Sequence, residues 1–227
     1  METSDWKAKR AVDLRGEVPL LDLITLFVLV DLDLFDKLFE QFPKIAIGQG
    51  TLAELWTLCQ VFSGCAFRDK CLDLQSRLKA RMTQIIQPIA SVDEADETED
   101  ANEPVSYREI KKLLAEKGFM LYSDDVIFRV WCLNDQGAKR SMSTLDLIEA
   151  LEQRELLDRA SAAKIIARLC AWNVGVMIQL KHQLALVPEA AVRARSISDA
   201  VGALQNDKDF SAIAAGMWDF RSDFNRS

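Results

Sequence analysis

The chain has 227 residues, of which 49% are apolar and 28% are charged, so a sizeable core can form and a mostly disordered chain is excluded. The formal charge is −7, but seven acidic residues lie within residues 93–103, and elsewhere 28 acidic residues balance 28 Lys and Arg. A strongly basic nucleic-acid binder is therefore excluded, whereas a local basic face is not.

The first half of the chain alternates short apolar segments with helical patterns. Strands are expected at residues 18–22, 44–47 and 85–89. Helices are expected at residues 24–39, 51–62 and 68–84. The first helix is either continuous or broken near Asp31, and Thr51 with Glu54 three residues later has the pattern of a capping box. Pro88 predicts that the third strand lies at a sheet edge, because proline cannot donate a ladder hydrogen bond.

The second half begins with an acidic loop at residues 91–104, whose composition is typical of a solvated segment. A strand is expected at residues 119–122, followed by a turn of Ser123, Asp124 and Asp125. Helices are expected from Ser106 or Tyr107 to Gly118, over 126–133, from Ser143 or Thr144 to residue 155, and from an N-cap at Ser161 to residue 172. The state of residues 173–186 stays open.

This order of elements predicts an α/β fold, a three-layer α/β/α arrangement with a short parallel central sheet and extra C-terminal helices. We expect an N-terminal extension at residues 1–15, one domain at residues 16–187 that contains the acidic loop, and a helical and aromatic tail at residues 188–227. The alternative is an all-helical regulatory domain without a sheet.

Acidic residues follow the predicted strands. Asp22 ends the first strand and Asp125 follows the fourth, while Glu54 lies one helical turn after the second. Ligands of parallel sheets bind beyond the carboxyl ends of the strands, so these acids should share one rim. Clustered carboxylates repel one another unless a cation joins them. Oxygen ligands suit Mg²⁺, which can polarise a phosphate and activate a bound water.

Three segments carry a family resemblance. They are Val-Pro-Leu-Leu-Asp22-Leu-Ile-Thr25-Leu, Thr51-Leu-Ala-Glu54-Leu and Leu121-Tyr-Ser-Asp-Asp125-Val-Ile-Phe128. In their order and spacing they resemble the PIN domain, a metal-dependent nuclease fold that most often cuts RNA, over about residues 16–180. The stretch 144–175 is similar to a PIN-like subgroup found within larger bacterial proteins, often joined to helical repeats.

The resemblance implies a hydrolase that cleaves RNA phosphodiester bonds with a Mg or Mn ion. The catalytic residues that it implies, which also hold the metal, are Asp22, Glu54 and Asp125. Further metal ligands would be Asp124 or Glu109, and the auxiliary residues would be Thr25 and Ser123. Thr25 would position a water molecule or a ligand carboxylate.

One position departs from the family pattern. PIN nucleases usually carry another Asp near the start of the helix before the late strand, and the usual interval back from Asp125 falls near Tyr107. Glu103 and Glu109 flank that position, so either Glu109 substitutes or the metal site is incomplete. An incomplete site favours the alternative function, a catalytically degenerate PIN-like module for protein–protein assembly within a larger complex. Contacts with other domains or subunits would then involve the aromatic tail residues Trp218, Phe220 and Phe224.

Each acid also has a local explanation. Asp22 lies in an apolar segment and needs a partner or a metal, whereas Glu54 can be the acid of a capping box. Asp124 and Asp125 can cap the next helix; we favour capping for Asp124 and metal binding for Asp125. Asp146 is either a surface acid at a helix start or a further ligand candidate.

Two other features are weighed in the same way. The basic residues of the 68–81 segment either track a phosphate backbone or form a solvated helix face; they are Arg68, Lys70, Arg77, Lys79 and Arg81. His182 is the only histidine and has no nucleophile at a recognisable spacing, so it is assigned no role.

The sequence also bears on location. The longest apolar run, residues 20–30, is interrupted by Asp22 and is too short to span a bilayer. Residues 1–15 have no apolar signal-peptide region. The five cysteines form no CxxC pair and are expected to be reduced thiols. We therefore expect a cytoplasmic protein that does not contact membranes.

Overall fold

The computed structural model describes residue 14 and residues 16–90, 103–135, 140–172, 184–194 and 196–212. The chain divides into two compact units, Met1–Leu147 and Ile148–Ser227. This division falls within a helix, whereas the sequence indicated a boundary after residue 187.

The first unit contains a sheet of five parallel strands in the order β3-β2-β1-β4-β5. The strands are β1 (Pro19–Leu21), β2 (Ile45–Ile47), β3 (Ile85–Ile86), β4 (Met120–Tyr122) and β5 (Ser141–Met142). The predicted α/β fold is confirmed, and the all-helical alternative is wrong. β3 lies at an edge, as Pro88 predicted. The sequence analysis missed β5, because a two-residue strand without an apolar run carries no pattern.

Helices connect and cover the strands. In the first unit they are α2 (Leu23–Asp31), α3 (Phe35–Gln41), α4 (Gln49–Val61), α5 (Ala66–Ala80), α6 (Val105–Lys117) and α7 (Val126–Asp135). A short 3₁₀ helix, η1 (Met82–Gln84), follows α5, and α8 (Thr144–Gln153) spans the division between the units. The second unit contains α9 (Arg159–Ala171), α11 (Glu189–Val192) and α12 (Ile197–Asn206).

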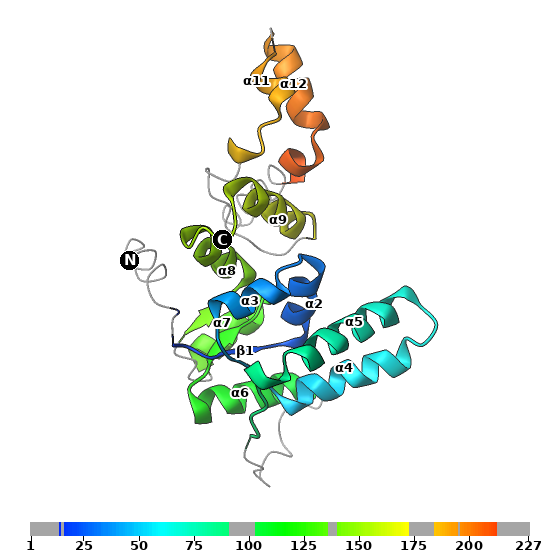
Figure 1. The fold of residues 1–227 in the computed structure, drawn as a ribbon, viewed down its shortest axis with the longest axis vertical. Coiled ribbons are helices and arrows are strands. Elements are labelled where there is room, and N and C mark those ends of the chain that lie inside the picture. Colours follow the sequence, from blue (N-terminus) through cyan, green and yellow to red (C-terminus); the bar gives the residue numbers. More distant parts are fainter. Residues whose placement is uncertain are drawn as a thin grey trace. The chain divides into compact units, whose positions relative to one another are not determined.

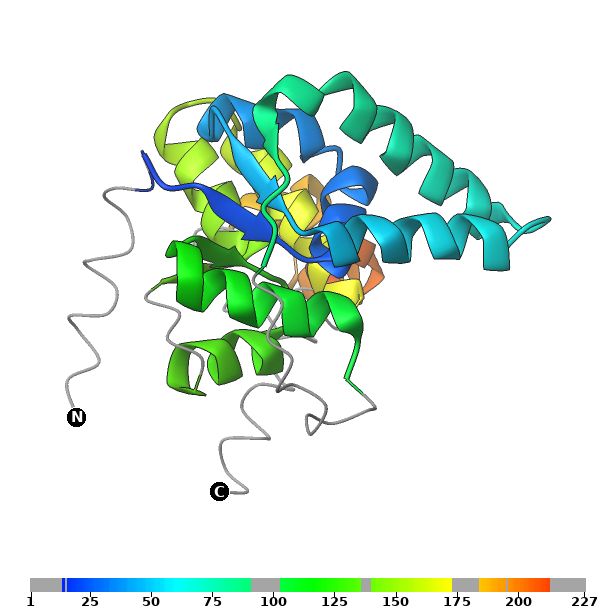
Figure 2. The same cartoon turned by 90° about the horizontal axis from the view of Figure 1, so that it is seen from below.

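The helices lie on both faces of the sheet, which gives three layers. Leu20 pairs in register with Ala46 and Leu121, and these three buried residues belong to one cluster with apolar residues of α6 and α7. Their fully buried neighbours Leu21 and Tyr122 point to the opposite face, because side chains alternate along a strand. Figure 1 shows α6 on one side of β1 and α2 with α3 on the other, and Figure 2 shows the same division from below.

The first predicted helix is two helices. Asp33 has φ 56°, in the left-handed region, and interrupts the chain between α2 and α3. The N–H of Asp33 donates to the carbonyl of Val30 at 3.1 Å, and the N–H of Leu34 donates to that of Leu29 at 2.8 Å. This is the Schellman arrangement that ends helices, with aspartate in the place that glycine usually takes. The predicted break near Asp31 is confirmed.

Two predicted helix caps are wrong. The helix α4 begins at Gln49 with Gly48 as its N-cap, so Thr51 lies inside the helix and does not form a capping box with Glu54. The N-cap of α9 is Asp158, whose carboxylate accepts the N–H of Ser161 at 2.9 Å, so Ser161 is the third residue of that helix and not its cap.

Candidate functional site

The predicted acids lie at one rim of the sheet. Asp22 follows β1, and Asp124 and Asp125 follow β4, at the carboxyl ends of neighbouring parallel strands. The helices α2, α4, α7 and α8 all begin directly after strands of this sheet, so their N-termini meet at the same edge. A helix N-terminus carries unpaired N–H groups and a partial positive charge, and both attract carboxylates. The hydrogen-bond partners of each acid show whether a helix N-terminus explains its position.

Asp22 is fully buried at the start of α2. Its Oδ1 accepts the N–H of Thr25 at 2.7 Å, whereas its Oδ2 is buried and has no hydrogen-bond partner among the described residues. Burial raises the pKa of Asp22 to about 6, against the opposing effect of hydrogen bonds from Ser123 and Thr25. The nearby charge of Asp124 raises this pKa slightly further. Asp22 therefore carries an unsatisfied oxygen at the centre of the rim.

Asp124 holds the start of α8. Its two carboxylate oxygens accept the N–H of Thr144 at 2.8 Å and the hydroxyl of Thr144 at 2.6 Å. Its own N–H donates to the hydroxyl of Thr25 at 2.9 Å, which connects it to the Asp22 cap. Burial raises the pKa of Asp124, and the hydrogen bonds from Thr144 oppose that rise. Asp124 is a capping residue, as we favoured, but it caps α8 and not the helix that follows it in sequence.

Asp125 caps α7. Its Oδ1 accepts the N–H of Phe128 at 2.9 Å, and its Oδ2 lies 3.5 Å from the hydroxyl of Tyr107. The hydroxyl of Ser123 accepts the N–H of Asp125 at 3.1 Å and so fixes the turn. Among the described residues, the second oxygen of Asp125 has this long hydrogen bond alone, so it is more weakly satisfied than the first.

Glu54 and Glu109 exchange caps between two helices. Glu54 of α4 accepts the N–H of Ser106 at 3.3 Å and its hydroxyl at 2.8 Å, at the start of α6. Glu109 of α6 accepts the N–H groups of Gln49 and Gly50 at 3.0 and 2.6 Å, at the start of α4. A side chain at Gly48 would collide with the Glu109 carboxylate, so this close approach requires glycine. In this structure both carboxylate oxygens of Glu109 are engaged in capping α4.

Tyr107 is the residue whose role the sequence analysis missed. Its ring stacks on Phe128 with 4.0 Å between centroids and 21° between planes. Burial raises the pKa of the Tyr107 phenol, followed by the charges of Asp22 and Asp125, the hydrogen bond to Asp125, and the charge of Glu54. Asp125 thus hydrogen-bonds this phenol, and the charges of Asp22 and Glu54 also raise its pKa. Tyr107 occupies the position at which the resemblance implies a further acid.

The donor chemistry of this rim fits a hard divalent cation only in part. Carboxylate oxygens are suitable ligands, and the buried Oδ2 of Asp22 lacks a partner. Within the described ranges, however, no group of three or more His, Cys, Asp and Glu side chains is arranged to hold a metal ion. The five acids at the rim each accept at least one N–H from the start of a helix, and the Tyr107 hydroxyl lies 3.5 Å from Oδ2 of Asp125.

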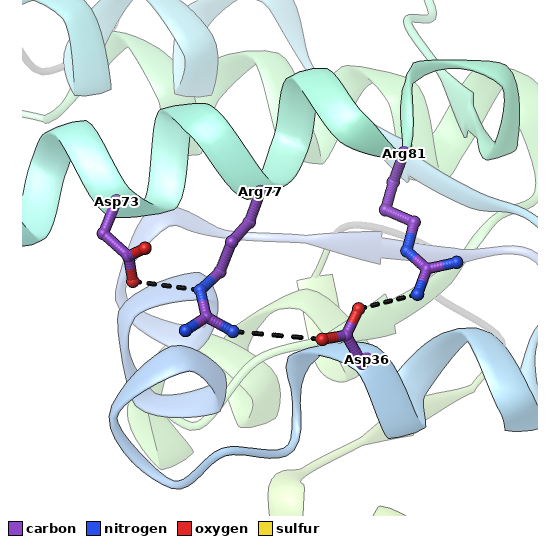
Figure 3. Close-up of polar contacts among 4 residues, drawn as sticks. All are labelled: Asp36, Asp73, Arg77 and Arg81. Carbon is purple, nitrogen blue, oxygen red and sulfur yellow. Dashed lines mark hydrogen bonds and ion pairs between the residues drawn. The ribbon is translucent and has the colours of Figure 1, made fainter.

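Basic side chains of α5 are engaged with acids of neighbouring elements. Asp36 of α3 lies 2.7 Å from Arg81 and 3.9 Å from Arg77, and Arg77 also bonds to Asp73 at 2.9 Å (Figure 3). Lys70 pairs with Asp31 at 2.6 Å. These ion pairs connect α5 and its C-cap to α2 and α3. They engage Lys70, Arg77 and Arg81, three of the five basic residues considered above for contact with a phosphate backbone.

The remaining predicted features divide between the described residues and the rest of the chain. Asp146 accepts the N–H and the hydroxyl of Ser143 at 2.8 and 2.9 Å, so it acts at the start of α8. All five cysteines are free thiols, with Cys65 exposed and the others buried. His182 and the aromatic residues Trp218, Phe220 and Phe224 lie outside the described residues. None of the helices in the described part of the chain has the length and apolar character that a bilayer crossing requires.

Comparison with known proteins leaves the family open. No protein-family model, curated protein or solved structure matches the chain. The resemblance to PIN domains therefore stays a prediction from the sequence.

Proposed function

We propose that the chain is a PIN-like, metal-dependent nuclease that hydrolyses RNA, with Asp22, Glu54 and Asp125 as the ligands of a Mg or Mn ion. One observation carries the proposal: Asp22 and Asp125 follow neighbouring parallel strands, and the buried Oδ2 of Asp22 has no hydrogen-bond partner among the described residues. Parallel sheets bind ligands beyond the carboxyl ends of their strands, and the proposed ligands belong to this rim. The five free cysteines favour a reducing compartment, so we place this activity in the cytoplasm.

A divalent cation bound at this rim would polarise a phosphodiester and lower the pKa of a bound water. The chain's own residues prepare the pocket. Asp22 has a pKa of about 6 and is therefore mostly ionised at pH 7, with its Oδ2 unoccupied. The Thr25 N–H and the Ser123 hydroxyl favour that ionised form, and the cap on α7 fixes one oxygen of Asp125.

The test is cleavage of labelled single-stranded RNA by the purified chain with Mn²⁺. Wild type should cleave, and Asp22→Asn should abolish cleavage because it removes the carboxylate with the unoccupied oxygen. Asp158→Asn is the matched control: it also neutralises a capping aspartate, but in the second unit, and asparagine caps helices equally well. Equal cleavage by wild type and Asp22→Asn would show that the activity arises elsewhere.

A second candidate is a catalytically degenerate module for assembly with other domains or subunits. It is favoured by the hydrogen bond of the Tyr107 phenol to Asp125 and by the helix N-terminal partners of Asp22, Glu54 and Asp125. The exposed apolar residues of α7, with Ile127 82% and Val130 52% exposed, also suit a protein contact. On this account millimolar Mn²⁺ leaves the melting temperature unchanged, whereas binding to the folded state would raise it.

A further inference from the structure

Two adjacent residues at the start of α6 engage two of the proposed ligands. The hydroxyl of Ser106 donates to Oε2 of Glu54 at 2.8 Å, and its N–H donates to Oε1 at 3.3 Å. The hydroxyl of Tyr107 donates to Oδ2 of Asp125 at 3.5 Å. The first turn of α6 therefore bridges two acids that come from α4 and from the β4–α7 turn.

Packing holds Tyr107 in this place more firmly than its hydrogen bond does. The ring stacks on Phe128, which is 3% exposed and belongs to the buried cluster beneath α6 and α7. A donor–acceptor distance of 3.5 Å is at the limit of a hydrogen bond, so the hydroxyl itself is weakly held. The phenol proton is directed at Asp125, and within the described ranges the buried Oδ2 of Asp22 has no partner.

We propose that Ser106 and Tyr107 form a latch over the acidic rim: Ser106 occupies Glu54 and Tyr107 occupies Asp125, two of the carboxylates that would bind a cation. The inference rests on the proposed function, and it adds that the first turn of α6 and a divalent cation compete for the same oxygens. Both latch residues are positioning residues, because they act through Glu54 and Asp125.

Competition of this kind has a measurable consequence. A cation that binds only the unlatched form binds with an apparent affinity reduced by the fraction of unlatched molecules. Removing the Ser106 hydroxyl should therefore tighten Mn²⁺ binding by about tenfold, the equivalent of about 1.4 kcal/mol and of one ordinary hydrogen bond. Removing the Tyr107 hydroxyl should tighten binding by a smaller factor, because its 3.5 Å hydrogen bond is weaker. Tyr107→Phe keeps the ring stacked on Phe128, and Ser106→Ala removes only the 2.8 Å bond to Glu54.

The experiment is a Mn²⁺ titration of the purified 227-residue chain, with free Mn²⁺ followed by electron paramagnetic resonance and the melting temperature recorded with and without Mn²⁺. The variants are Tyr107→Phe, Ser106→Ala and the double variant. Tyr107→Phe combined with Asp22→Asn is the control that ties any gain in affinity to this pocket. Neither readout requires RNA cleavage.

The latch predicts tighter binding by each single variant, a larger gain in the double variant, and loss of the gain when Asp22 is also replaced. Measurable Mn²⁺ binding that is equal in wild type, Tyr107→Phe and Ser106→Ala would overturn the latch while leaving the proposed metal site intact. No binding by any variant, including Tyr107→Asp with its added carboxylate, would overturn both the latch and the proposed function.

Discussion

Asp22→Asn should stabilise the protein at neutral and alkaline pH, because the buried carboxylate costs free energy when it ionises. Its pKa rises from 3.8 to about 6 on folding, which corresponds to roughly 3 kcal/mol at about 1.4 kcal/mol per pKa unit. An acid whose pKa is raised in the folded state binds its proton more tightly there than in the unfolded chain. The stability that it contributes is therefore present below pH 3.8 and is lost as the pH rises through about 6.

The asparagine amide introduced by this substitution would keep an oxygen for the N–H of Thr25 and would replace the unpartnered Oδ2 with a neutral group. At pH 7.5 the free energy of unfolding should increase by about 1–3 kcal/mol. The increase is smallest if the N–H groups of the introduced amide find no acceptor, because a buried unpaired donor is destabilising. Near pH 4.5 the two proteins should differ less.

Urea unfolding of wild type and Asp22→Asn between pH 4.5 and pH 8 measures both effects. Asp124 also has a raised pKa, so the stability of Asp22→Asn should still fall as the pH rises, but less steeply than that of wild type. Asp158→Asn serves again as the control, since the pKa of this exposed cap is lowered by its hydrogen bonds to Ser161. A variant that is less stable than wild type at pH 7.5, or one with an unchanged pH profile, would refute the argument that Asp22 is a destabilising buried charge.

Three further substitutions test other contacts. Asp36→Asn removes the partner of two partly exposed arginines, Arg77 of α5 and Arg81 at its C-cap, so it should cost less than about 1 kcal/mol, and the cost should shrink in high salt. A large, salt-independent loss would contradict a surface pair. Gly48→Ala should displace the Glu109 carboxylate from its cap on α4 and lower the free energy of unfolding, measured with urea, by about 1–2 kcal/mol. Gly202→Ala in α12 is the control: its added carbon meets nothing within 4 Å, so this variant should be neutral or stabilising. Phe128→Ala should cost about 3–5 kcal/mol by the same measurement, because it empties a buried site beneath Tyr107, and a loss under 1 kcal/mol would show that the cluster is loosely packed.

The strands and the rim could be predicted from the sequence because their signals are local. The apolar segments before Asp22 and Asp125 mark strands, and parallel order brings the ends of neighbouring strands to one edge. A carboxylate that follows such a strand must lie near the rim wherever the rest of the chain goes. The two-residue β5 lacked any such signal, since Ser141 and Met142 form a strand only through pairing with β4.

The partners of the acids could not be predicted, because they come from distant parts of the chain. Thr51 and Glu54 have the spacing of a capping box, yet Glu109, about 60 residues away from the helix start, caps α4 instead. Glu54 in turn reaches the start of α6, which the sequence could not place beside it. The count back from Asp125 did arrive at Tyr107, but only the fold shows that its phenol hydrogen-bonds to Asp125.

The most direct test of the metal site is diffraction from crystals of the wild-type chain soaked in Mn²⁺, with the ion located by its anomalous signal. The account predicts one ion bound by Asp22 and Asp125, with Glu54 as a third ligand, and a displaced Tyr107 hydroxyl. A soaked crystal in which Tyr107 keeps its bond to Asp125 and the anomalous signal is absent from this rim would contradict the account.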